Sequence, residues 1–164
     1  MFHRFLLFIV LAINISADLM EPTSYSKDLY NEVILDDSYI NSIDHPNKFL
    51  DFDYATRVAT PEQITSALLT WSNQSDRLKV IEYARSHENR PLNAVFISSP
   101  KNLKNLNLIK DKISQLSDAR ITNDRKAKKL INELPAVAWM AYSIHGNETS
   151  GAAAALGVIY HLIA

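Results

Sequence analysis

His145 and Glu148 are the residues of this chain whose types and spacing point most directly to chemistry. They stand three positions apart in the tetrapeptide His-Gly-Asn-Glu, and an imidazole and a carboxylate are a common pair of Zn²⁺ ligands. Gly146 between them permits a tight backbone turn, which would let both side chains point into one crevice. On spacing alone two interpretations stay open, a pair of metal ligands or a hydrogen-bonded structural histidine near an unrelated glutamate.

A catalytic zinc site needs three protein ligands and an open position, so the pair requires a third partner. His161 follows Glu148 by thirteen positions, and a helix that rises about 1.5 Å per residue would carry it about 20 Å away. We therefore expect His161 to pack in the protein or to face solvent. His45 and His87 are alternative third partners if the fold brings them near the pair, but no local feature of the sequence supports either one.

The segments on either side of the pair must position it. Residues 136–144 are almost entirely apolar and follow the helix-ending Pro135, which predicts a strand buried on both faces of a sheet. Residues 149–164 are rich in alanine and large apolar residues and predict a helix. The loop between them would lie at the carboxyl end of the strand, where α/β proteins bind ligands.

The preceding residues predict the rest of an α/β fold with a mixed central sheet and flanking helices. Residues 60–63 form a capping box that begins a helix. Two apolar runs around a turn at residues 87–91 predict a hairpin, and Ser99-Pro100 begins a further helical stretch. Residues 124–134 predict a short charged helix, and residues 18–55 an irregular lead-in with one short helix.

Composition excludes several classes of protein. The chain has 164 residues, of which 47% are hydrophobic and 21% charged, with a formal net charge of −1. These values indicate a folded globular protein and give no electrostatic basis for binding nucleic acid. The absence of cysteine excludes disulfides, cysteine zinc fingers, iron–sulfur clusters and a thiol nucleophile. All three glycines lie in the last nineteen residues, so the earlier part holds no glycine-rich phosphate loop.

Residues 1–17 have the pattern of a signal peptide. Arg4 precedes the apolar run of residues 5–15, and Ser16-Ala17 offers small residues for cleavage. The run is shorter than the roughly 20 residues of a membrane-spanning helix. We expect a secreted or periplasmic protein with no stable membrane span after cleavage. A buried helix and an uncleaved anchor stay as alternatives.

Residues 134–164 resemble the first zinc-ligand motif of the zinc carboxypeptidase family (metallocarboxypeptidases), in which a buried strand ends in His-x-x-Glu and a small-residue helix follows. Residues 83–92, with the turn Arg-Pro-Leu, resemble the early hairpin of that family, and residues 97–100 resemble the exit of its second strand. The resemblance implies a partial metallocarboxypeptidase-like domain over residues 56–164, with its C-terminal part missing. The final helix also lacks the usual stop signals, which agrees with an N-terminal fragment.

The resemblance further implies that His145 and Glu148 are two ligands of one Zn²⁺ that activates water to hydrolyse a peptide or protein substrate. In that family the third ligand histidine, the substrate-binding arginines and the general-base glutamate lie further along the chain. We therefore expect them beyond residue 164, assign no catalytic residue here and expect the segment alone to be inactive. Arg85 and Arg90 are not assigned to substrate binding, because surface arginines are usually solvated or structural.

Two other functions are compatible with the sequence. Zinc amidohydrolases of the aspartoacylase and succinylglutamate desuccinylase type use a similar His-Gly-Asn-Glu loop. Those enzymes place the loop soon after their start, whereas a long segment precedes it here, which favours the peptidase. The other alternative is a truncated, non-catalytic domain that binds metal loosely or not at all.

Overall fold

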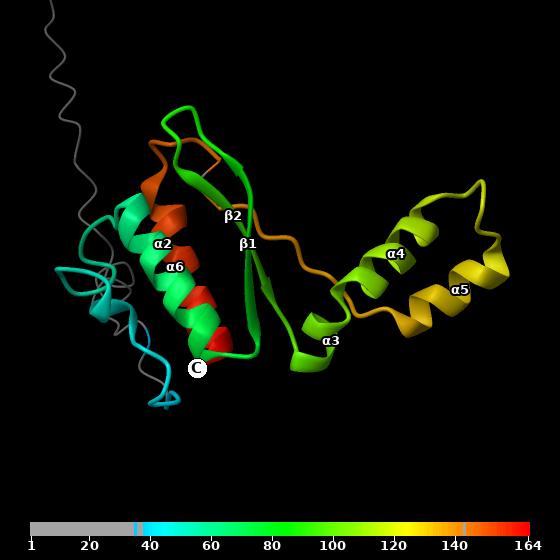
Figure 1. Cartoon of the computed structure of the whole chain (residues 1–164), viewed down its shortest axis with the longest axis horizontal. Helices are drawn as coiled ribbons and strands as arrows, with labels where there is room; N and C mark the ends of the chain where they lie inside the picture. The colour runs from blue at the N-terminus through cyan, green and yellow to red at the C-terminus, as the bar shows by residue number, and fades with distance from the viewer. Residues whose placement is uncertain (1–34, 36–37, 143) are drawn as a thin grey trace, which may run out of the picture. The chain divides into compact units, whose positions relative to one another are not determined.

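The structure, a computed structural model, describes residue 35 and residues 38–142 and 144–164 (Figure 1). The predicted signal peptide of residues 1–17 lies outside the described residues, as does the first part of the lead-in. The elements in chain order are η1 (Pro46–Lys48), α2 (Pro61–Gln74), β1 (Leu78–Arg85), β2 (Pro91–Ile97), α3 (Pro100–Lys104), α4 (Leu106–Ser117), α5 (Asp124–Glu133) and α6 (Thr149–Ile163).

Helix α2 begins with the capping box that the sequence predicts. The Thr60 hydroxyl oxygen accepts from the Gln63 N–H at 3.2 Å, and the Gln63 side-chain oxygen accepts from the Thr60 N–H at 2.9 Å. Pro61 occupies the first turn, where no intrahelical partner exists for an N–H group. The apolar stripe of this helix is buried through Ala67, Leu68 and Trp71.

Strands β1 and β2 form the predicted hairpin, with antiparallel pairing from Leu78 opposite Ile97 to Arg85 opposite Pro91. A bulge between Glu82 and Ala84 shifts the register. One face of the hairpin packs into the core. The hydrophobic residues of this face are Leu78, Val80, Val95 and Ile97.

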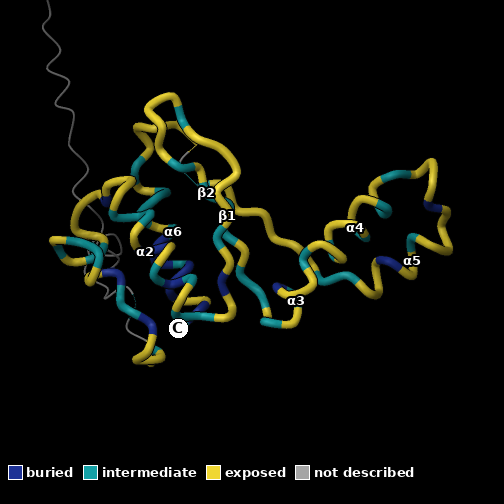
Figure 2. The backbone as a smooth tube through the Cα atoms, viewed as in Figure 1, coloured by how far each residue is buried: buried dark blue, intermediate teal, exposed yellow. Residues whose placement is uncertain are grey.

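The core lies between α2, α6 and the inner face of the hairpin, and Figure 2 shows buried positions on these elements. Trp71 stands at its centre with 0% exposure, and its ring centroid is 5.6 Å from that of Phe49 and 6.0 Å from that of Tyr160. The Trp71 indole N–H donates to the Asp44 carbonyl oxygen at 2.7 Å. The lead-in therefore contributes to the same core as the helices.

Helices α3, α4 and α5 follow the hairpin. Asn105 ends α3 and begins α4, so the helical stretch expected after Pro100 is divided in two. The predicted charged helix is α5, which is joined to α4 by an ion pair of 2.7 Å between Lys112 and Glu133. No helix in the part of the chain that the structure describes is long and apolar enough to cross a bilayer.

The segment of residues 136–144 is not the buried strand that its apolar sequence predicts. Its described positions carry no strand pairing, and Val137, Trp139 and Ile144 are 67%, 86% and 76% exposed. An apolar segment becomes a buried strand only where neighbouring strands bond to its edges and other elements cover its faces. The described residues contain one sheet, of β1 and β2 alone, so the expected mixed central sheet is not formed within them.

Candidate metal site

His145 and Glu148 stand at the two ends of one β-turn. The Glu148 N–H donates to the His145 carbonyl oxygen at 3.0 Å, the bond between first and fourth residues that closes such a turn. In a β-turn the first and fourth Cα atoms lie within about 7 Å of each other. The structure therefore brings the two predicted ligands together on one short loop, and both are exposed to solvent.

The turn contains Gly146 but does not depend on the special properties of glycine. Its φ is not positive, and a Cβ atom at this position would have no heavy atom within 4 Å. Turns with negative φ at the central residues accept any amino acid, so the backbone does not require glycine here. Close packing does not require glycine at this position either.

Glu148 is also the N-cap residue of α6, with φ −92° and ψ 70°. Its carboxylate makes no capping hydrogen bond to the helix. The positive end of a helix dipole favours a negative charge at this place by about 0.3–1 kcal/mol.

Two of the other described histidines make contacts of their own. His161 is near the C-terminal end of α6, where the Tyr39 hydroxyl lies 3.0 Å from its Nδ1 atom. His45 accepts from the Asn47 N–H through Nδ1 at 3.2 Å, and burial lowers the pKa of His45. His87 lies exposed in the hairpin turn.

The donor types at the turn fit Zn²⁺, which binds imidazole nitrogen and carboxylate oxygen. Within the described ranges no group of three or more histidine, aspartate or glutamate residues could hold a metal ion. The turn thus brings together two candidate ligands, whereas a catalytic zinc site takes three from its protein.

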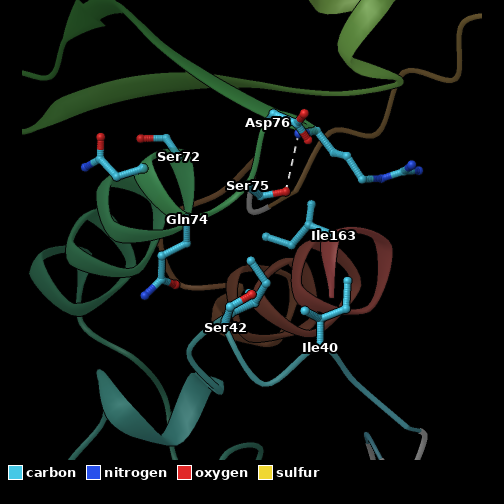
Figure 3. Close-up of a pocket in the computed structure, with 10 residues that line it drawn as sticks. Ile40, Ser42, Ser72, Gln74, Ser75, Asp76 and Ile163 are labelled. Carbon is cyan, nitrogen blue, oxygen red and sulfur yellow. Dashed lines mark hydrogen bonds between the residues drawn. The ribbon is translucent and has the colours of Figure 1, made fainter.

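A hollow in the surface lies away from this turn. It is formed where α2 ends, β1 begins and α6 ends, and Figure 3 shows Ile40, Gln74 and Ile163 around it. Ile163 is at the opposite end of α6 from Glu148, about 22 Å along the helix axis. The residues that line the hollow include no histidine, so the hollow and the candidate metal ligands are separate features.

The sequence did not reveal that Tyr54 contacts α6, the helix that follows the turn. The Tyr54 hydroxyl, from the lead-in, donates to the Ala153 carbonyl oxygen of α6 at 2.7 Å. Gly157, one helical turn later, lies against the same phenol. Glycine inside a helix is less favourable than alanine by about 1 kcal/mol, so Gly157 was the available signal of a close approach.

A family model described as zinc carboxypeptidase matches residues 65–164, which are 100 of the 164 residues. The matched range includes most of α2, the hairpin, helices α3 to α5, the turn with His145 and Glu148, and α6. Comparison with curated proteins gives no match, and comparison with solved structures gives none either.

Proposed function

The chain belongs to the zinc carboxypeptidase family, and from this premise we propose that it is the N-terminal part of an exported zinc metallocarboxypeptidase. The observation that carries the proposal is the turn in which the Glu148 N–H bonds to the His145 carbonyl. This turn holds an imidazole and a carboxylate together inside the matched residues. The family match also favours a peptidase over the amidohydrolases that use a similar loop.

In the proposed function His145 and Glu148 bind one Zn²⁺ through a ring nitrogen and a carboxylate oxygen. The bound metal supplies a Lewis acid that polarises the scissile carbonyl and lowers the pKa of a water molecule. The short turn keeps the backbones of the two residues in fixed relation, which reduces the entropy lost on binding. The substrate would be a peptide or protein.

The remaining parts of the site are proposed to come from chain beyond residue 164. They are the third ligand, the general base and the arginines that the family uses to bind substrate. Support comes from the exposed apolar residues between Pro135 and His145, because an apolar patch of this kind usually marks a surface that another element covers. In the complete domain, residues 136–144 would be a strand of a mixed central sheet, and the present segment alone would be inactive.

The domain organisation stays a proposal as well. Residues 1–17 would be a cleaved signal peptide that directs the protein to the periplasm or the exterior. Residues 18–55 would be a lead-in, and residues 56–164 the N-terminal portion of the catalytic domain. The support for export is Arg4 followed by an apolar run and small residues.

A Zn²⁺ titration of the chain against a chromophoric chelator tests the proposed function. We expect binding of one ion, reduced to background by His145→Ala and by Glu148→Ala. His87→Ala is the matched control, because it removes an exposed imidazole far from the turn in sequence and should leave binding unchanged. Binding that is indifferent to all three substitutions would support the non-catalytic alternative and remove the metal assignment.

A further inference from the structure

Tyr54 bonds to a backbone carbonyl inside helix α6. Its hydroxyl donates to the Ala153 carbonyl oxygen at 2.7 Å, and Gly157, one helical turn further along, lies against the same phenol. In a regular α-helix the N–H of residue 157 pairs with the carbonyl of residue 153. The phenol therefore adds a second donor to a carbonyl of the helical ladder and ties the lead-in to the helix backbone.

Only glycine at position 157 permits this contact. A Cβ atom there would lie 2.2 Å from the Tyr54 hydroxyl oxygen and 2.9 Å from its Cζ atom. Both distances are far below van der Waals contact, so any larger residue would displace the ring. The unfavourable helix propensity of glycine, about 1 kcal/mol relative to alanine, is thus offset by a specific tertiary contact.

Tyr54 also lies near the segment that leads into the ligand turn. Burial raises the pKa of the Tyr54 phenol, the Gly157 hydrogen bond lowers it, and the nearby Tyr142 hydroxyl raises it. Tyr142 precedes His145 by three residues, and Ala153 follows Glu148 by five. The phenol thus bonds to the arm that follows Glu148, and Tyr142 in the arm that precedes His145 affects its pKa.

The first turn of α6 needs such support, because no side-chain cap holds its beginning. Helix ends fray unless their first N–H groups are bound or their residues are anchored by other contacts. The Tyr54–Ala153 hydrogen bond is such an anchor and lies little more than one helical turn beyond Glu148. Movement of this part of the helix would move the Glu148 carboxylate with it.

We infer that Tyr54 is a positioning residue for the metal ligands: by holding α6 at Ala153 and Gly157 it keeps Glu148 where His145 can share a metal ion with it. The inference rests on the proposed function, since it assumes that the pair binds metal. Tyr54 precedes the residues matched by the family model, which begin at residue 65. The positioning contact is thus made by the lead-in.

Co²⁺ binding to the full chain, followed by its visible absorption, tests this role. Tyr54→Phe keeps the ring and removes the hydroxyl, and we expect about tenfold weaker Co²⁺ binding, as for other groups that orient metal ligands. The spectrum at saturating Co²⁺ should also change, because ligand geometry changes. The matched control is Tyr39→Phe, which removes a hydroxyl that bonds to His161 at the other end of α6 and should leave both readouts unchanged.

Gly157→Ala provides a second, independent variant. It should displace Tyr54 and weaken Co²⁺ binding at least as much as Tyr54→Phe, with little further loss when the two are combined. Equal affinity and identical spectra for wild type, Tyr54→Phe and Tyr39→Phe would overturn the inference. If wild-type binding does not depend on His145 and Glu148, the proposed function fails first, so the two failures are distinguishable.

Discussion

The Glu148 N–H group lies 3.0 Å from the His145 carbonyl oxygen, so a backbone hydrogen bond joins the two candidate ligands. Insertion of one alanine after Gly146 would move the two residues to a spacing that this turn cannot close. We expect Zn²⁺ affinity to fall about tenfold or more, measured by chelator competition. An alanine inserted after His87, in the hairpin turn, is the control. Undiminished affinity in the first insertion would contradict the role of the turn.

The capping box of α2 predicts a stability effect that does not involve metal. Thr60→Ala removes one capping acceptor, and we expect the free energy of unfolding to fall by about 1 kcal/mol, measured by urea denaturation. Ser66→Ala, on an exposed position of the same helix, should be neutral or slightly stabilising because alanine has the higher helix propensity. Equal effects of the two substitutions would argue against the cap.

We expect iodide to quench the fluorescence of the two tryptophans to very different extents. Trp71 is fully buried, whereas Trp139 is 86% exposed. Trp139→Phe should therefore leave emission that iodide barely quenches, and Trp71→Phe should leave emission that iodide quenches readily. Strong quenching of Trp71 in the Trp139→Phe protein would be incompatible with the described core.

Substitution of Trp71 and of Trp139 should have different effects on the free energy of unfolding. Trp71→Phe removes the hydrogen bond to the Asp44 carbonyl and some core volume, which should reduce the free energy of unfolding by about 1–3 kcal/mol. Trp139→Phe should change it by less than about 0.5 kcal/mol. Urea denaturation of both variants measures the difference.

Burial of the His45 imidazole should make the free energy of unfolding depend on pH. Burial lowers the pKa of His45 below its usual value of 6.5, so the unfolded chain binds a proton more readily than the folded one. The contribution of this residue is present above about pH 6.5 and is lost as the pH falls through the lower folded pKa.

His45→Asn should flatten that dependence, because asparagine also caps a helix start but does not titrate. The measurement is the urea midpoint at pH 5 and pH 7.5 for both proteins. A steeper loss toward pH 5 in the variant than in the wild type would reverse the sign of the prediction.

Elements that depend on neighbouring residues were predictable from the sequence. The Thr60–Gln63 capping box, the hairpin and α6 are confirmed, because caps, turns and helical periodicity act between residues a few positions apart. The strand predicted for residues 136–144 is not formed at the positions of this segment that the structure describes. Their apolar composition indicates burial, but strand pairing needs partners that the sequence of the segment does not specify.

By itself, the sequence determined the types and spacing of His145 and Glu148 and the identity of most local elements. Only the structure showed that His145 and Glu148 close one turn and that Gly146 does not adopt a positive φ. It also showed that Tyr54 forms a hydrogen bond to helix α6. The Tyr54–Ala153 contact joins residues 99 positions apart. No local pattern encodes such a contact, because it exists only after the lead-in and the helix have packed on a common core.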